Sequence, residues 1–204
     1  MFGTKLFRIR ALVEFGDVEA GELGGYVEKE SNLGHDDNAW VYGDARVYDN
    51  ALVYDNARVY GDAQVSGDAR VYDNARVYGD AWVYGDAWVY GNARVCGNAR
   101  VYDNARVYGD AWVYGNARVC GDALVCGDAR VCGNGDYAYA HGFGSVNRTT
   151  TFFGLKDGGV GVRCGCFYGT LAQFRDKIRE THGETKKAQE YLMLADLMKL
   201  RFEK

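Results

Sequence analysis

Proline is absent from the 204 residues of this chain. Because proline removes a backbone donor, its absence fits a chain in which nearly every residue lies in a strand or at a polar corner. No apolar run is long enough to cross a membrane, and Lys5, Arg8 and Arg10 interrupt the apolar residues at the start. We therefore expect a soluble cytoplasmic protein with no secretory signal and no membrane partner.

Strong net charge of either sign is also lacking. The chain carries −4, with −2 over residues 1–35, −5 over residues 36–134 and +3 over residues 135–204. A dominant basic patch of the kind that binds duplex DNA is therefore not expected. The carboxylates of the middle segment alternate with arginines, which also argues against mimicry of DNA.

Residues 39–134 are sixteen consecutive hexapeptides without an insertion. Alanine occupies every sixth position from Ala39 to Ala129, and valine every sixth position from Val41 to Val131. Residues two apart share one face of an extended strand, whereas a helix would spread them around its circumference. Each hexapeptide therefore predicts a short strand followed by a corner. Strands this short bury little alone, so they must stack into a solenoid.

An aliphatic residue followed four positions later by a small one recurs along the repeats, as at Val41 and Ala45 or Val71 and Ala75. This pattern resembles the hexapeptide-repeat, left-handed parallel β-helix family. The resemblance implies a mainly β fold with three hexapeptides per coil, so that residues 18 apart lie above one another. The left-handed sense and a homotrimer, or another homo-oligomer, also come from the resemblance.

The segments that flank the repeats carry a second resemblance. The sequences L-F-R-I-R-A-L and G-D-V-E-A-G-E-L-G-G-Y-V near the start, and T-T-T-F-F and C-G-C-F-Y-G-T near the end, resemble proteins of bacteriophages and prophages. Those proteins are often labelled transferases or polymer-forming proteins. The resemblance implies a phage protein in the bacterial cytoplasm, and it implies no established reaction.

Hexapeptide-repeat enzymes depend on histidine, which residues 39–134 do not contain. Acyltransferases of this class hold a histidine on a loop between coils, and carbonic anhydrases gather three around zinc. Here no loop interrupts the repeats, and His35, His141 and His182 lie outside them. We therefore predict a non-enzymatic protein with no catalytic residue, no cofactor and no metal. An acyltransferase-like enzyme using His35 or His141 is an alternative.

The outward positions of the hexapeptides carry whatever specificity the solenoid has. Arg, Trp, Leu or Gln follows each alanine, and Tyr, Cys or Ser follows each valine. A period of 18 arranges the first set in three columns, Trp40-Arg58-Arg76-Arg94-Trp112-Arg130, Arg46-Gln64-Trp82-Arg100-Arg118 and Leu52-Arg70-Trp88-Arg106-Leu124. Arginine beside aromatic rings either stabilises an outer coat or forms a binding surface. The candidate binding residues are Trp82, Trp88, Trp112, Arg94, Arg100, Arg106, Tyr84, Tyr90 and Tyr108.

The corner residues and the cysteines are better explained by structural roles than by metal binding. Stacked corner residues such as Asn56, Asn74 and Asn92 are expected to form hydrogen bonds along a column. The nine-residue calcium-binding repeat is not present. Four cysteines, Cys96, Cys120, Cys126 and Cys132, occupy the outward tyrosine position, and we expect free thiols. The pair Cys164 and Cys166 is a weak metal signal, and neighbours on one face of a hairpin are the preferred interpretation.

The chain divides into three segments. Residues 1–38 predict a capping strand and an irregular first coil, with Val27 and Leu33 in the alanine register. Residues 39–134 form the β-helix. Residues 135–204 predict a hairpin within 136–168 and two helices, the first capped by Thr170 and Gln173 and ended by Gly183, the second from about Thr185 to Leu200. These helices are expected to cover the lower end of the solenoid or to pack against another subunit.

The features together favour a binding protein that displays a rigid Arg/Tyr/Trp surface. By the phage resemblance, its most concrete version is an inhibitor of a host defence component that blocks a protein or sequesters a nucleotide. A structural or assembly module without a host target is the competing hypothesis.

Overall fold

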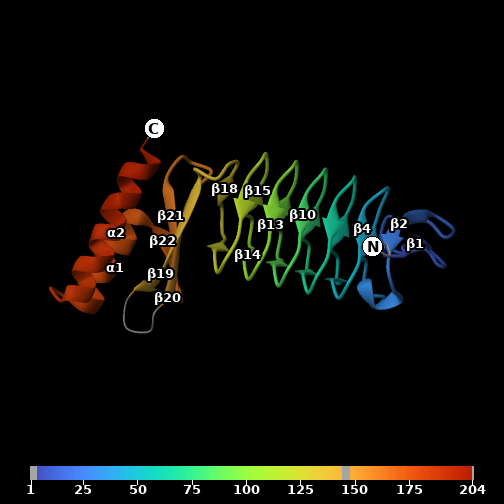
Figure 1. The fold of residues 1–204 in the computed structure, drawn as a ribbon, viewed down its shortest axis with the longest axis horizontal. Coiled ribbons are helices and arrows are strands. Elements are labelled where there is room, and N and C mark those ends of the chain that lie inside the picture. Colours follow the sequence, from blue (N-terminus) through green and yellow to red (C-terminus); the bar gives the residue numbers. More distant parts are fainter. Residues whose placement is uncertain (1–3, 144–147, 204) are drawn as a thin grey trace.

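The computed structural model describes residues 4–143 and 148–203 (Figure 1). The fold is mainly β, with a parallel β-solenoid of about six turns, a C-terminal antiparallel sheet and two C-terminal helices. The N-terminal strands lie at one end of the long axis and the helices at the other. Residues 1–3, 144–147 and 204, which belong to the first and third predicted segments, lie outside the described residues.

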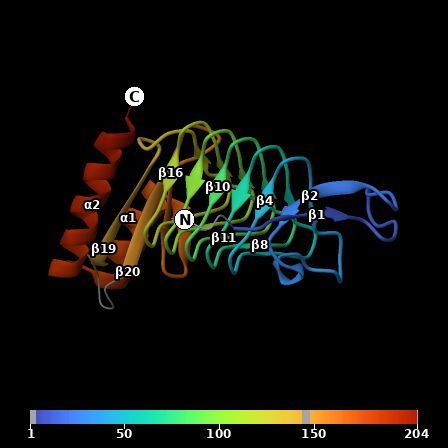
Figure 2. The same ribbon diagram turned by 45° about the vertical axis from the view of Figure 1, so that its right-hand side comes forward.

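Three sheets form the walls of the solenoid (Figure 2). The seven-stranded sheet contains β1 (Phe7–Arg10), β2 (Leu23–Val27), β4 (Arg46–Val47), β7 (Gln64–Val65), β10 (Trp82–Val83), β13 (Arg100–Val101) and β16 (Arg118–Val119). The five-stranded sheet contains β5 (Leu52–Val53), β8 (Arg70–Val71), β11 (Trp88–Val89), β14 (Arg106–Val107) and β17 (Leu124–Val125). The six-stranded sheet contains β3 (Trp40–Val41), β6 (Arg58–Val59), β9 (Arg76–Val77), β12 (Arg94–Val95), β15 (Trp112–Val113) and β18 (Arg130–Val131).

Every third strand of the repeats pairs in parallel within one wall, as Trp82 with Arg100 and Trp88 with Arg106. The alanines and valines of the hexapeptides face the interior, and from Ala45 to Val131 each of them is fully buried. The predicted inward faces are thus confirmed.

The first corner residue adopts left-handed backbone in nearly every hexapeptide, with φ between 56° and 72°. Glycine takes this conformation without strain, and four corners use aspartate instead. At those corners the carboxylate accepts a hydrogen bond from the backbone N–H of the next coil, as Asp55 does from Asp73 at 3.1 Å. Hydrogen bonds between corner side chains join Asn38 with Asn56 and Asn92 with Asp110, rather than the predicted neighbours Asn56 and Asn74.

The first coil is out of register with the repeats. Val27 pairs with Val47 and Leu33 with Val53, so both occupy valine positions. The predicted alanine register for these two residues is therefore wrong, because two extra residues lie between Leu33 and Val41. The helical turn η1 (Glu30–Asn32) precedes this insertion. The buried Asn32 amide donates to the carbonyls of Asp49 and Ala51 at 3.0 and 2.8 Å, which caps the end of the stack.

Trp40 is buried, although the column projection places it outside. The N-terminal segment lies over it, with the Phe15 ring 5.4 Å away edge to face. A Cβ atom on Gly24 would lie only 2.8 Å from the Trp40 ring. Sequence periodicity assigns a side to each residue but cannot show which outer positions another segment covers.

The C-terminal sheet has four strands where the sequence predicts one hairpin. They are β19 (Tyr137–Phe143), β20 (Arg148–Gly154), β21 (Val160–Cys164) and β22 (Phe167–Thr170), in that order across the sheet. The predicted hairpin is β20 with β21, and the outer strands were missed. The alternation of large and small residues in Tyr137-Ala-Tyr-Ala-His was the available signal for β19.

This sheet covers the end of the solenoid. Phe153 belongs to the solenoid core, whereas its neighbour Phe152 packs against the helices, because successive side chains of a strand point to opposite faces. Thr151 Oγ1 accepts the backbone N–H of Leu124 at 2.9 Å, and Asn134 Oδ1 accepts that of Arg118 at 2.9 Å. The backbone N–H groups of the last coil have no further coil to donate to. These side-chain oxygens accept their hydrogen bonds instead.

Helices α1 (Leu171–His182) and α2 (Lys186–Phe202) cover the outer face of this sheet. The capping box of Thr170 and Gln173 is confirmed, and the C-cap is Gly183. The second helix begins after its N-cap Thr185, as predicted, and its buried residues are Ala188, Tyr191, Ala195 and Met198. The sheet lies between the helices and the solenoid core, so the direct cover of the solenoid end is the sheet and not the helices.

Candidate functional site

The outer face of the five-stranded sheet brings together more of the predicted binding residues than either other wall. We call it the Trp88 face, and its outward residues are Leu52, Arg70, Trp88, Arg106, Leu124, Tyr54, Tyr72, Tyr90 and Tyr108. Alternation along each strand points these residues outward while valine points inward. Four of the nine predicted residues, Trp88, Arg106, Tyr90 and Tyr108, lie here.

Trp88 lies between two arginines of neighbouring coils. The guanidinium carbons of Arg70 and Arg106 lie 5.0 and 4.6 Å from the centre of its ring. Both faces of the indole are therefore covered by cations. Such pairs contribute about 0.5–1 kcal/mol each at exposed sites, and they hold the guanidinium groups in fixed positions.

Four tyrosines form a continuous stack beside Trp88. The rings of Tyr54, Tyr72, Tyr90 and Tyr108 follow one another at 4.9 Å, and all three pairs are nearly parallel. Burial raises the pKa of Tyr72 to about 12, with the neighbouring tyrosines adding to the effect. A tyrosine hydroxyl is protonated at neutral pH even without such a shift, so each ring of the stack carries one O–H donor.

The other predicted residues are divided between the two remaining walls. Trp82, Arg100 and Tyr84 lie on the seven-stranded sheet, where Arg100 lies 5.0 Å from the Trp82 ring. Trp112 and Arg94 lie on the six-stranded sheet, where Arg94 and Arg130 cover the two faces of Trp112 at 4.8 and 4.9 Å. The nine residues therefore form three separate aromatic and cationic groups.

The arginines of the Trp88 face are not paired with carboxylates within 4.0 Å in the described part of the chain. Arg58, by contrast, forms an ion pair with Asp17 of the N-terminal segment. That hydrogen bond with Arg58 is the main cause of a lowered pKa at Asp17. Arg70 and Arg106 keep N–H groups that a bound carboxylate or phosphate can accept.

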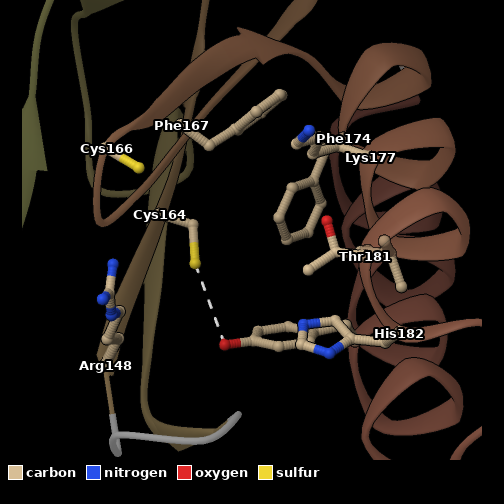
Figure 3. Close-up of a pocket in the computed structure, with 10 residues that line it drawn as sticks. Arg148, Cys164, Cys166, Phe167, Phe174, Lys177, Thr181 and His182 are labelled. Carbon is tan, nitrogen blue, oxygen red and sulfur yellow. Dashed lines mark hydrogen bonds between the residues drawn. The ribbon is translucent and has the colours of Figure 1, made fainter.

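A cavity of about 260 Å³ lies between the C-terminal sheet and α1 (Figure 3). Cys164 Sγ accepts a hydrogen bond from Thr150 Oγ1 at 3.2 Å and donates to the Tyr191 hydroxyl at 3.8 Å. The Tyr191 hydroxyl in turn donates to the Phe143 carbonyl at 3.2 Å. Thr150, Cys164, Tyr191 and the Phe143 carbonyl thus form one chain of hydrogen bonds, of which Cys164 and Tyr191 line the cavity.

Cysteine positions differ in two places from the sequence prediction. Cys164 ends β21, but Cys166 lies in the turn after it, so the two are not neighbours on one strand face. Cys126 is buried because the C-terminal sheet covers its corner, and burial is the main cause of its raised pKa. All six cysteines are free.

The three histidines occupy separate places. His35 lies 3.8 Å from Glu30, and His141 forms a hydrogen bond with Thr149 at 2.9 Å. His182 stacks on Tyr191 with ring centres 5.9 Å apart. Over residues 4–143 and 148–203, no three His, Cys, Asp or Glu side chains are grouped so as to hold a metal ion. No helix in the same residues has the length and apolar character needed to cross a bilayer.

Comparison with protein families gives matches within the solenoid. The repeats match the family described as YdcK Beta solenoid repeat. The matched segments are residues 39–54, 45–61, 51–67, 63–75, 69–85 and 99–115. They cover less than half of the chain, and they agree with the parallel solenoid in the structure. The search of curated proteins returned no match.

Proposed function

We propose that this chain is a non-enzymatic binding protein whose Trp88 face binds carboxylates on the surface of a partner protein. The observation that supports this most is the pair of arginines stacked on both faces of Trp88. Both guanidinium groups already lie over the ring before binding, so less side-chain freedom is lost when a partner docks. Tyrosine, tryptophan and arginine are also the residues that most often dominate binding energy at interfaces.

A protein partner fits this face better than a nucleobase does. Base binding relies on a free aromatic face on which the base can stack. Here each inner tyrosine is stacked on both sides, and both faces of Trp88 are covered by guanidinium groups. What the surface presents is ring edges, hydroxyl groups and guanidinium N–H groups, which suit a carboxylate-bearing protein surface.

The acidic corners set a limit on the partner's charge pattern. Corner aspartates such as Asp55 and Asp73 border the Trp88 face, and their carboxylates accept backbone N–H groups of the next coil. The fitting surface therefore has its carboxylates in a central row, opposite the arginine column, and avoids acidic groups at its edges.

We also infer the finer features of the solenoid. The pairing of every third strand supports three hexapeptides per coil, and the Val-to-Ala spacing resembles the left-handed class. The resemblance of the flanking segments to phage proteins supports an inhibitor of a host component in the bacterial cytoplasm. In this proposal the partner is a host protein, and the absence of histidine from residues 39–134 supports a non-enzymatic mode of action.

An affinity pull-down from bacterial lysate tests the proposal, with retained proteins and small molecules both identified by mass spectrometry. The test variant is Arg70→Ala with Arg106→Ala. Its matched control is Arg46→Ala with Arg118→Ala, which removes the same charge from exposed positions of the seven-stranded sheet. We expect one protein to be retained by the wild type and the control and lost by the test variant. Equal retention by both variants, or retention of a nucleotide alone, would contradict the proposal.

A further inference from the structure

Helix α2 carries an exposed apolar stripe on the side away from the protein. Met193, Leu197 and Leu200 are 71%, 55% and 70% exposed. Their spacing of four and three residues places them on one line along the helix. The opposite side of α2 is also apolar and packs into the C-terminal core. A helix that is apolar on both sides is normally covered on both.

Charged residues beside the stripe indicate what covers it. At 100° per residue, Glu190 and Arg201 lie on the same flank of the stripe, three turns apart. When two copies of one helix pack antiparallel about a two-fold axis, residues on one flank face residues on the same flank of the other copy. Glu190 then lies opposite Arg201 of the second copy, and the two-fold axis generates a second, equivalent pair.

The two charges are available for such a contact. The ion pairs of the two helices use other residues, namely Arg175–Asp196, Lys177–Glu180, Arg179–Asp176 and Lys199–Glu203. Among the described residues Glu190 has no cation within 4.0 Å. Arg201 donates one hydrogen bond, to the Asn134 carbonyl at 3.3 Å, and retains other N–H groups.

We propose that two copies of this chain associate through α2, antiparallel and about a two-fold axis. Met193 of each copy then lies near Leu200 of the other, and the two Leu197 side chains meet at the axis. Glu190 of each copy pairs with Arg201 of the other. The register is self-consistent, because the midpoints of the pairs 193/200 and 190/201 differ by only one residue. Such an isologous contact closes on itself and gives a dimer, not a filament.

The position of α2 permits this arrangement. The helices form the outermost layer at the end of the long axis opposite the N-terminal strands (Figure 2). A second copy can therefore dock without meeting the solenoid, and the two solenoids would point away from each other. The dimer goes beyond the proposed binding function and does not depend on it. If the Trp88 face does bind a partner, the dimer would present two such faces at opposite ends.

Light scattering coupled to size-exclusion chromatography tests the dimer across a dilution series. We expect the wild type to show about twice the 22.6 kDa mass of one chain. Leu197→Glu should give the single-chain mass with unchanged circular dichroism. Leu12→Glu is the matched control, since Leu12 is 82% exposed at the opposite end of the molecule, and it should remain dimeric. A monomeric wild type, or a Leu197→Glu variant that stays dimeric, would overturn the proposal.

Charge exchange tests the antiparallel register separately. Glu190→Arg alone and Arg201→Glu alone should each weaken the dimer at least several-fold, because each places two like charges opposite one another twice. The double variant restores opposite charges and should recover the wild-type dissociation constant to within a few-fold. A double variant as weak as the single variants would exclude the antiparallel pairing. This readout does not require any partner protein, so its failure is distinguishable from failure of the proposed binding function.

Discussion

Arg100 lies 5.0 Å from the centre of the Trp82 ring, although the two residues are far apart in the sequence. They are paired in neighbouring strands, so the contact joins one coil to the next. The same holds for Trp88 and Trp112, each of which is covered from the coil on either side. The outer coat is therefore part of what holds the coils together, as well as a surface that a partner can meet.

Replacing Arg100 by alanine should lower the free energy of unfolding by about 0.5–1 kcal/mol, because the cation over the Trp82 ring is lost. Arg100→Lys should retain part of this, since an ammonium group still lies over the ring but cannot stack flat on it. Urea denaturation measures both. Arg46→Ala is the control. Arg46 is exposed on the same sheet between Gln64 and Tyr26, and among the described residues its guanidinium lies over no aromatic ring, because Arg8 covers Tyr26. A loss at Arg46 as large as that at Arg100 would show that the ring contact contributes nothing.

A larger apolar side chain should be tolerated on the outer surface of the solenoid but not in its interior. Ala87 is fully buried between the three walls, so Ala87→Leu should reduce the free energy of unfolding by about 1–3 kcal/mol. Arg118→Leu places an apolar side chain at an exposed outward position of the seven-stranded sheet and should change stability by less than about 0.5 kcal/mol. Chemical denaturation of the two variants side by side provides the comparison. An Ala87→Leu variant as stable as the wild type would mean that the interior has room that the structure does not show.

The corner aspartates predict an unusual order of stability among variants at Gly85. This residue has φ +68°, and an added Cβ would lie 3.0 Å from the Asp103 backbone nitrogen. Gly85→Ala should therefore be destabilising by about 1–2 kcal/mol. Gly85→Asp meets the same strain, but its carboxylate can accept the Asp103 N–H, as Asp55 accepts that of Asp73. We expect the aspartate variant to be about 1 kcal/mol more stable than the alanine variant by urea denaturation. The reverse order would contradict this role for the carboxylate.

Most of the solenoid was predictable because its signal is local and repeated. The Ala and Val periods fix which side of each strand is buried, and the corner residues follow from their backbone conformation. The predictions that are wrong concern the residues at and before the start of the repeats. Two extra residues shift Val27 and Leu33 to the valine positions, and Trp40 is covered by a segment whose path the repeats do not determine.

The candidate site was predictable in part. The period of the repeats places Trp88 between Arg70 and Arg106, but it does not say that both guanidinium groups lie over the indole ring. The cavity around Cys164 depends on contacts between β20, β21 and α2, elements that are far apart in the sequence. Its hydrogen bonds join side chains 14 and 27 residues apart, and no local sequence pattern predicts them.

Thr151 should be sensitive to loss of its hydroxyl group alone. Its buried Oγ1 accepts the Leu124 N–H at 2.9 Å, and valine has the same shape without the acceptor. Thr151→Val should thus leave a buried N–H unpaired and lower the free energy of unfolding by about 1–3 kcal/mol. Thr181→Val, at an exposed position of α1 beside the cavity of Figure 3, serves as the control and should cost less than about 0.5 kcal/mol. Native-state hydrogen exchange should also show faster exchange at Leu124. Unchanged exchange there would argue that another acceptor takes its place.

The tyrosine stack predicts a loss of stability at high pH. Burial and the neighbouring tyrosines raise the pKa of Tyr72 from 10.0 to about 12, so the folded chain holds this proton more tightly than the unfolded chain does. The resulting stabilisation is fully present below pH 10 and is lost as the pH rises through about 12, because only the unfolded state ionises readily in that window. Tyr72→Phe removes the titrating group and should reduce the fall in unfolding free energy between pH 10 and pH 12. Urea denaturation across this range, with ultraviolet absorbance following phenolate formation, measures both effects. An identical pH dependence in wild type and variant would refute this account of the stack. So would a difference in absorbance between wild type and variant that shows the Tyr72 phenolate forming near pH 10 in the folded chain.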